Sequence, residues 1–128
     1  MIKNPLTVIE WSDIEKLNGE ICEKARYQHG RTSDGYEPAK QLFEERKGQA
    51  KLDLPDVVDT MRELHKLAPF LFLNGNTFSE MGTRMSGWFS NKPLSALQRS
   101  AVGHHIAGVR VLDRKELKAI FKDRDLER

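Results

Sequence analysis

The sequence predicts a mainly α-helical protein, a single compact domain of about five to six helices with at most two short strands. Its length of 128 residues is close to the common size of one domain. Apolar residues recur three or four positions apart in successive segments, and glycine or proline residues stand between these segments. The apolar fraction of 38% and the charged fraction of 31% are ordinary for a globular chain. We therefore expect residues 1–128 to form one helical domain.

The chain is expected to start with an N-terminal arm or short strand over residues 1–11, because residues 6–11 are β-prone. The first helix should begin at Ser12, whose hydroxyl would form a capping box with Glu15. Gly30 is expected to end this helix. Its inner face would consist of Ile14, Leu17, Ile21 and Ala25.

Two helices are expected next. The second covers residues 38–47 and stops at Gly48. The third has Pro55 in its first turn and ends before Pro69, because the residue before a proline disfavours the helical conformation. Its apolar stripe is made of Val57, Val58, Met61, Leu64 and Leu67.

A fourth helix is expected to start at Thr77, which would form a capping box with Glu80. At 100° per residue, its aromatic and methionine side chains fall within one arc of about 100°. Together with the preceding apolar run, they predict the centre of the core. This predicted centre comprises Phe70, Phe72, Phe78, Met81, Met85, Trp88 and Phe89.

The last two helices complete the predicted domain. One opens at Pro93, and Gly108 ends it. Residues 109–112 suit a second short strand, Asp113 should cap the final helix, and residues 123–128 should fray. The inner faces would hold Leu94, Leu97, Ala101 and Val102 in one helix, and Leu117, Ile120 and Phe121 in the other.

Charge is distributed unevenly along the chain. Residues 74–110 contain four basic residues and one acidic residue, whereas residues 1–73 carry a net charge of −2. A local basic surface attracts phosphate groups or acidic proteins, although an uneven solvated surface gives the same pattern. The residues expected to contact nucleic acid or an acidic partner are Arg84, Lys92, Arg99 and Arg110. The two helices of this region also resemble a helix-turn-helix, which would bind DNA.

The segment of Asn74, Gly75, Asn76 and Thr77 is the candidate ligand-binding loop. It leads into a helix start, where free backbone N–H groups can bind an anion, and Gly75 would allow a close approach. The alternative is a plain turn before a capped helix.

One resemblance to a known family involves this loop. His65, followed by Pro69 and Phe70 and then by the loop, loosely resembles the central motif of Fic/Doc enzymes, which transfer nucleotide or phosphate groups. Ala68 stands where that family has its catalytic histidine, so no catalytic role is transferred to this chain.

The histidines His65, His104 and His105 are the remaining candidate functional groups. His105 falls at the centre of an apolar helix face, which favours a hydrogen-bonded core histidine over a ligand or base. No pair of residues has metal-ligand spacing and no nucleophile motif is present, so the sequence predicts no catalytic residue, metal or cofactor. Carboxylates at Glu20 and Glu23 should disfavour a Cys22 thiolate.

These observations favour a small, non-catalytic binding or regulatory module with a cationic face at residues 74–110. The alternatives are a small enzyme or nucleotide-binding protein that uses the 74–77 loop, and an adaptor or homo-oligomer subunit that docks through its phenylalanine, tryptophan and methionine cluster. No segment reaches the roughly 18 consecutive apolar residues of a membrane span, and the single cysteine, Cys22, suits a reducing compartment. A cytoplasmic location away from membranes is therefore expected.

Overall fold

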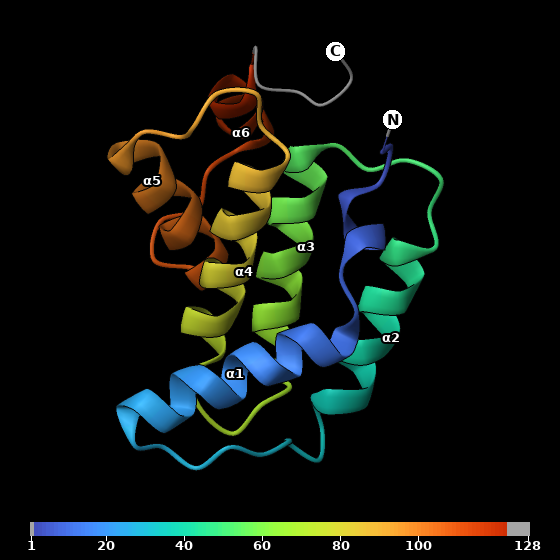
Figure 1. The fold of residues 1–128 in the computed structure, drawn as a ribbon, viewed down its shortest axis with the longest axis vertical. Coiled ribbons are helices and arrows are strands. Elements are labelled where there is room, and N and C mark those ends of the chain that lie inside the picture. Colours follow the sequence, from blue (N-terminus) through green and yellow to red (C-terminus); the bar gives the residue numbers. More distant parts are fainter. Residues whose placement is uncertain (1, 123–128) are drawn as a thin grey trace.

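The computed structural model describes residues 2–122 and is mainly helical (Figure 1). The elements are η1 (Pro5–Val8), a 3-10 helix, followed by α1 (Trp11–Ala25), α2 (Tyr36–Lys47), α3 (Leu54–Leu67), α4 (Asn74–Trp88), α5 (Ala96–Ala107) and α6 (Arg114–Phe121). This confirms the predicted fold class, a compact helical domain of five to six helices. Residues 123–128, which were predicted to fray, lie outside the described part of the chain.

Three helices form the middle of the molecule. α4 packs against both α3 and α5, and α3 also contacts α5. α2 packs on the other side of α3, α6 contacts α3 at one end, and α1 runs across the opposite end, where it packs mainly on α4 (Figure 1). α4 therefore has other helices packed on several of its sides.

The core is built around aromatic rings from three parts of the chain. Phe78 of α4 is fully buried and stacks on Phe70, with ring centroids 6.1 Å apart. Trp11 of α1 stacks on the other side of this cluster, 6.0 Å from Phe70. α4 approaches α5 closely at Gly82, where an added Cβ would lie only 2.4 Å from the Ile106 side chain.

The predicted N-terminal strand is wrong, because residues 5–8 form a 3-10 helix. Asn4 caps this helix with its side-chain oxygen, and its amide nitrogen donates to the carbonyl of Arg46, 2.8 Å away, at the end of α2. α1 starts at Trp11 with a reciprocal capping box between Glu10 and Asp13, instead of at Ser12. It ends at Ala25, five residues before the predicted end. The sequence contains both capping patterns, and only the packing of Trp11 selects one.

The second predicted strand, residues 109–112, is also absent. Within residues 2–122, the only β-type pairing is one antiparallel bridge between Arg31 and Phe70. Val109 and Val111 are exposed, while Leu112 is buried and donates its N–H to His105. The segment is therefore a connection that is anchored through Leu112.

Several predicted helix ends are confirmed. Asp113 caps α6 as predicted and forms a capping box. Pro55 lies in the first turn of α3 as predicted, and the structure adds Asp53 as the cap of that helix. Gly48 follows the end of α2, and Gly108 ends α5 with a φ of 78°, a left-handed conformation that suits glycine. α5 begins at Ala96, with Ser95 as its cap, not at Pro93.

Five residues predicted to face the core are exposed instead. Trp88 is 56% exposed, Phe72 41%, Leu97 84% and Leu67 37%, and Ala25 at the end of α1 is exposed as well. α1 crosses α4 near the start of α4 (Figure 1). Met81 is buried, whereas Trp88, two turns further along the same side of α4, is exposed. The helical period of the sequence predicts which face of a helix is apolar. It does not predict how far along the helix a neighbouring element covers that face.

Along the described residues, no helix is both long and apolar enough to cross a membrane.

Candidate functional site

A groove of about 700 Å³ lies between the second half of α4, the connection of residues 89–95 and the first turns of α5. We call it the α4–α5 groove. Its lining includes Glu80, Thr83, Arg84, Ser90, Arg99 and Ser100. Two of the four basic residues singled out in the sequence therefore share one groove, together with several hydroxyl groups.

Arg84 lies one helical turn after Glu80, and its Nε–H donates to the Glu80 carboxylate at 2.9 Å. Both side chains are about half exposed, so this pair adds little to stability. The pair uses only Nε, so the two terminal amino groups of Arg84 remain for another acceptor. A guanidinium group held in this way suits an anion that accepts two hydrogen bonds.

Ser90 carries the unusual polar atom of the groove. Its Oγ is buried and has no hydrogen-bond partner among the described residues. A buried hydroxyl without a partner costs about 1–3 kcal/mol, and native proteins rarely tolerate one. Because this oxygen atom is buried, a molecule in the groove could reach it only after a local movement of the connection of residues 89–95.

Arg99 adds positive charge at the start of α5. Ser95 and Gln98 cap each other at this helix start, and the backbone N–H of Arg99 donates to Ser95. The Arg99 side chain is exposed and lines the groove. The partial positive charge of the helix N-terminus adds to its effect.

The other two basic residues are placed differently. Lys92 is exposed on the connection between α4 and α5 and is not part of the groove lining. Arg110 lies three residues past the end of α5, whereas Arg99 is near the start of that helix. The structure therefore brings Arg84 and Arg99 together in one groove, and it places Arg110 at the other end of α5.

The predicted ligand loop is the first turn of α4, which begins at Asn74. The predicted capping box between Thr77 and Glu80 is wrong: Thr77 is inside the helix, where its hydroxyl donates to Leu73 and accepts from Asn18. The Asn74 side chain binds both backbone groups of Phe70, at 3.0 and 2.8 Å. Two of the four predicted ligand side chains are thus used within the fold. The predicted anion site at this helix start remains a prediction that would depend on backbone N–H groups, Gly75 and the exposed Asn76.

The three histidines have separate surroundings. His65 is half-buried, its Nδ1–H donates to the Ile106 carbonyl at 3.0 Å, and its ring packs beside Gly75. His104 is exposed. His105 is buried, as the sequence predicted, but its hydrogen-bond partners are Asp59 and the Leu112 backbone. Asp59 and His105 are 46 positions apart in the chain, so the spacing of neighbouring residues could not predict this hydrogen bond.

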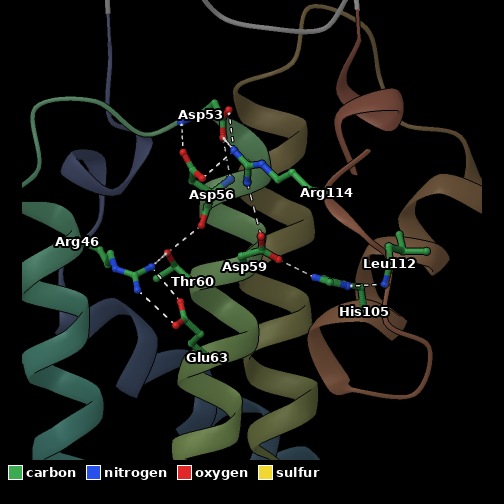
Figure 2. A network of polar contacts seen from close by, with 9 residues as sticks. All are labelled: Arg46, Asp53, Asp56, Asp59, Thr60, Glu63, His105, Leu112 and Arg114. Carbon is green, nitrogen blue, oxygen red and sulfur yellow. Dashed lines mark hydrogen bonds and ion pairs between the residues drawn. The ribbon is translucent and has the colours of Figure 1, made fainter. Parts of the chain in front are cut away.

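His105 belongs to a polar network on the other side of α5, shown in Figure 2. Its Nδ1 accepts the Leu112 N–H at 2.8 Å, so the neutral ring carries its proton on Nε2 and donates to Asp59. Arg114 of α6 reaches Asp53, Asp56 and Asp59 of α3 at 3.1, 2.8 and 3.5 Å. Burial lowers the pKa of Arg114, but the nearby aspartates outweigh this effect and raise it overall. The network fixes α6 and residues 109–112 to α3.

An exposed apolar patch lies where α1 and α3 end. Tyr27 and Phe72 place their ring centroids 5.1 Å apart, and both rings are nearly half exposed. We call these two rings the Tyr27–Phe72 patch. Leu67 and Leu71 are also exposed, and they line a hollow with Arg31 and Gly35 that neither ring lines. Of the phenylalanine, tryptophan and methionine cluster that the sequence suggested as a docking surface, Phe72 and Trp88 are exposed.

Cys22 is buried, and this burial raises the pKa of its thiol. The sequence attributed a disfavoured thiolate to the carboxylates of Glu20 and Glu23. In the structure, the pKa of the thiol is raised because the thiol is buried. Among residues 2–122, no group of three or more histidine, cysteine, aspartate or glutamate side chains is placed to hold a metal ion.

No protein-family model matches the chain, and no curated protein or solved structure is significantly similar to it. The resemblance to the Fic/Doc motif is therefore limited to the residues quoted above. The connection between α4 and α5 covers residues 89–95, which is longer than the three- or four-residue turn of a helix-turn-helix.

Sequence reasoning overlooked two groups at this site. Ser90 carried no signal, because an unpartnered hydroxyl can be recognised only from its surroundings. Trp88 was assigned to the core, although it is exposed beside Arg84. The position of Trp88 in the last turn of α4 could have indicated its exposure, because the ends of helices often extend past the elements that pack on them.

Proposed function

We propose that this protein is a non-catalytic binding and regulatory module that binds the phosphate groups of nucleic acid in the α4–α5 groove. The observation that supports this proposal is the placement of Arg84 and Arg99, with Ser100, in the lining of one groove. A phosphate group can accept hydrogen bonds from both guanidinium groups, and phosphate contacts of this kind provide most of the affinity of non-specific nucleic-acid binding. The single, buried Cys22 agrees with the cytoplasmic location that we propose for it.

An acidic protein could also pair with the two arginines. A phosphate group fits the groove better, because a hydroxyl donor beside two guanidinium groups suits an anion with several oxygens. Glu80 also lines the groove and offsets one of its two positive charges. The remaining charge attracts a single anionic group only weakly, so strong attraction requires a dense row of such groups. Nucleic acid has such a row of charges.

The double variant Arg84→Gln/Arg99→Gln should bind a labelled oligonucleotide more weakly, as measured by fluorescence anisotropy at several salt concentrations. Each lost phosphate contact should reduce the slope of log K against log salt by about 0.7–0.9. The matched control is Lys24→Gln/Lys40→Gln, which also removes two positive charges from exposed helix positions outside the groove. Equal affinity in both double variants would contradict the proposal, and so would binding that ignores salt. Binding of an acidic peptide, but of no oligonucleotide, would favour the acidic-protein alternative.

A second candidate function is that of a subunit or adaptor, and the Tyr27–Phe72 patch favours it. Its two contacting rings are 49% and 41% exposed, and Leu67 and Leu71, which precede Phe72 in the chain, are exposed as well. Exposed apolar side chains that gather at one place mark a surface that a partner can cover. We expect the chain to associate with increasing concentration in analytical ultracentrifugation, and the variant Leu71→Ser/Phe72→Ser should not. The control is Val109→Ser, which is an exposed apolar residue outside the patch. A chain that stays monomeric at every concentration would rule out the subunit form.

A further inference from the structure

We propose that the nucleic acid bound by this protein is single-stranded, and that Trp88 is the surface on which one of its bases stacks. This inference rests on the function proposed for the α4–α5 groove and adds the class of ligand to it. The observations behind it are the exposure of Trp88, its position relative to Arg84, and the charges around it.

The two tryptophans of the chain differ sharply in their surroundings. Trp11 is 4% exposed and packs in the core, whereas Trp88 is 56% exposed at the end of α4. A large aromatic side chain buries much apolar area when it is covered, so an open one marks a surface that a partner can cover. The open face of Trp88 is thus available for stacking.

Arg84 links Trp88 to the phosphate groove. The two residues are one helical turn apart, and side chains with this spacing lie on the same side of a helix, about 5–6 Å apart at Cβ. Arg84 lines the α4–α5 groove and also a second hollow of about 320 Å³, in which Trp88, Val8 and Lys16 take part. A nucleotide can therefore place its phosphate in one hollow and its base in the other.

The charges of the two hollows differ in the way that this arrangement requires. Arg84 lines both hollows. When it is assigned to the groove, the groove holds Arg84 and Arg99 against Glu80, and the second hollow keeps Lys16 against Asp13 and Glu20. The excess positive charge therefore lies in the α4–α5 groove, and a neutral base suits the second hollow better than a phosphate group does.

Stacking on Trp88 requires a base with a free face. In a duplex, each base is already stacked on both sides and paired at its edge, so a protein must first extract it at a cost of a few kcal/mol. A single strand offers its bases without this cost, and aromatic side chains beside a cationic groove are the usual way to bind it. Trp88 therefore favours a single strand over a duplex.

The test compares a labelled oligothymidylate with a duplex of the same length, bound to the full chain and to the variants Trp88→Ala and Trp88→Phe. Trp88→Ala should weaken single-strand binding by about fivefold or more, and Trp88→Phe should keep most of the affinity. Neither variant should change duplex binding. The single strand should also quench the tryptophan fluorescence of the unmodified chain, because Trp88 is the exposed tryptophan of the two, and this quenching should be absent in Trp88→Phe.

Each outcome decides between the two proposals. If Trp88→Ala binds the single strand as tightly as the unmodified chain, or if the duplex binds equally well, the stacking proposal is wrong. In that case, sensitivity to Arg84→Gln/Arg99→Gln would still support the phosphate groove. If neither nucleic acid binds, both proposals are overturned.

Discussion

Replacing Phe78 with alanine should lower the free energy of unfolding by about 3–5 kcal/mol. The Phe78 ring is fully buried on α4 and stacks on Phe70, which in turn stacks on Trp11. Its removal would leave a cavity among rings from three separate parts of the chain, and the rigid helices around it cannot close that cavity. Urea unfolding followed by circular dichroism measures the effect.

Phe72→Ala is the matched control for this experiment. Phe72 belongs to the same apolar run as Phe70 and was predicted to share the core, but its ring is 41% exposed and contacts Tyr27 at the surface. Its removal should cost about 1 kcal/mol or less. Similar losses for Phe78→Ala and Phe72→Ala would show that the described burial is wrong.

Gly35→Ala should be the second most damaging substitution, with a loss of about 3 kcal/mol in stability. A Cβ at position 35 would lie 2.0 Å from the carbonyl oxygen of Leu67 and 2.5 Å from that of Ala68. Both atoms belong to the backbone where α3 ends, and Thr32 holds the Ala68 oxygen with a hydrogen bond of 2.7 Å. No flexible side chain can move aside to relieve the clash, so the loop or the end of α3 must shift.

Gly87→Ala should have the opposite sign. Gly87 lies within α4, and an added Cβ would meet nothing within 4 Å. Alanine in a helix interior is more favourable than glycine by about 0.5–1 kcal/mol, so this variant should gain stability. Thermal unfolding of the two variants under the same conditions tests the pair, and a loss in both cases would contradict the steric explanation for Gly35.

Local signals predicted most of the helices. The stripe of α3, apart from the exposed Leu67, and the end signals at Gly48, Gly108 and Asp113 depend on neighbouring residues, and the structure confirms them. The two predicted strands are wrong because a strand also needs a partner strand that is distant in sequence. Residues 2–122 provide no such partner at either place.

Burial was harder to predict than helix position. Met85, Trp88 and Leu97 all fall on apolar helix faces, but only Met85 is buried. Coverage depends on where a neighbouring helix ends, and that is a property of the whole fold. The candidate site shows the same limit, because the charge pattern indicated Arg84 and Arg99 but could not separate them from Arg110 or point to Ser90.

The position of α1 on α4 has a kinetic consequence. α2 packs on α3, α3 on α4 and α4 on α5, so these pairs join helices that follow one another in the chain. α1 instead packs mainly on α4, and Asn18 bonds to Thr77 across 59 positions of sequence. Closing a longer loop costs more chain entropy, and contacts distant in sequence form more slowly. We therefore expect the four consecutive helices to assemble by short-range pairing, and α1 to dock after α4 has formed.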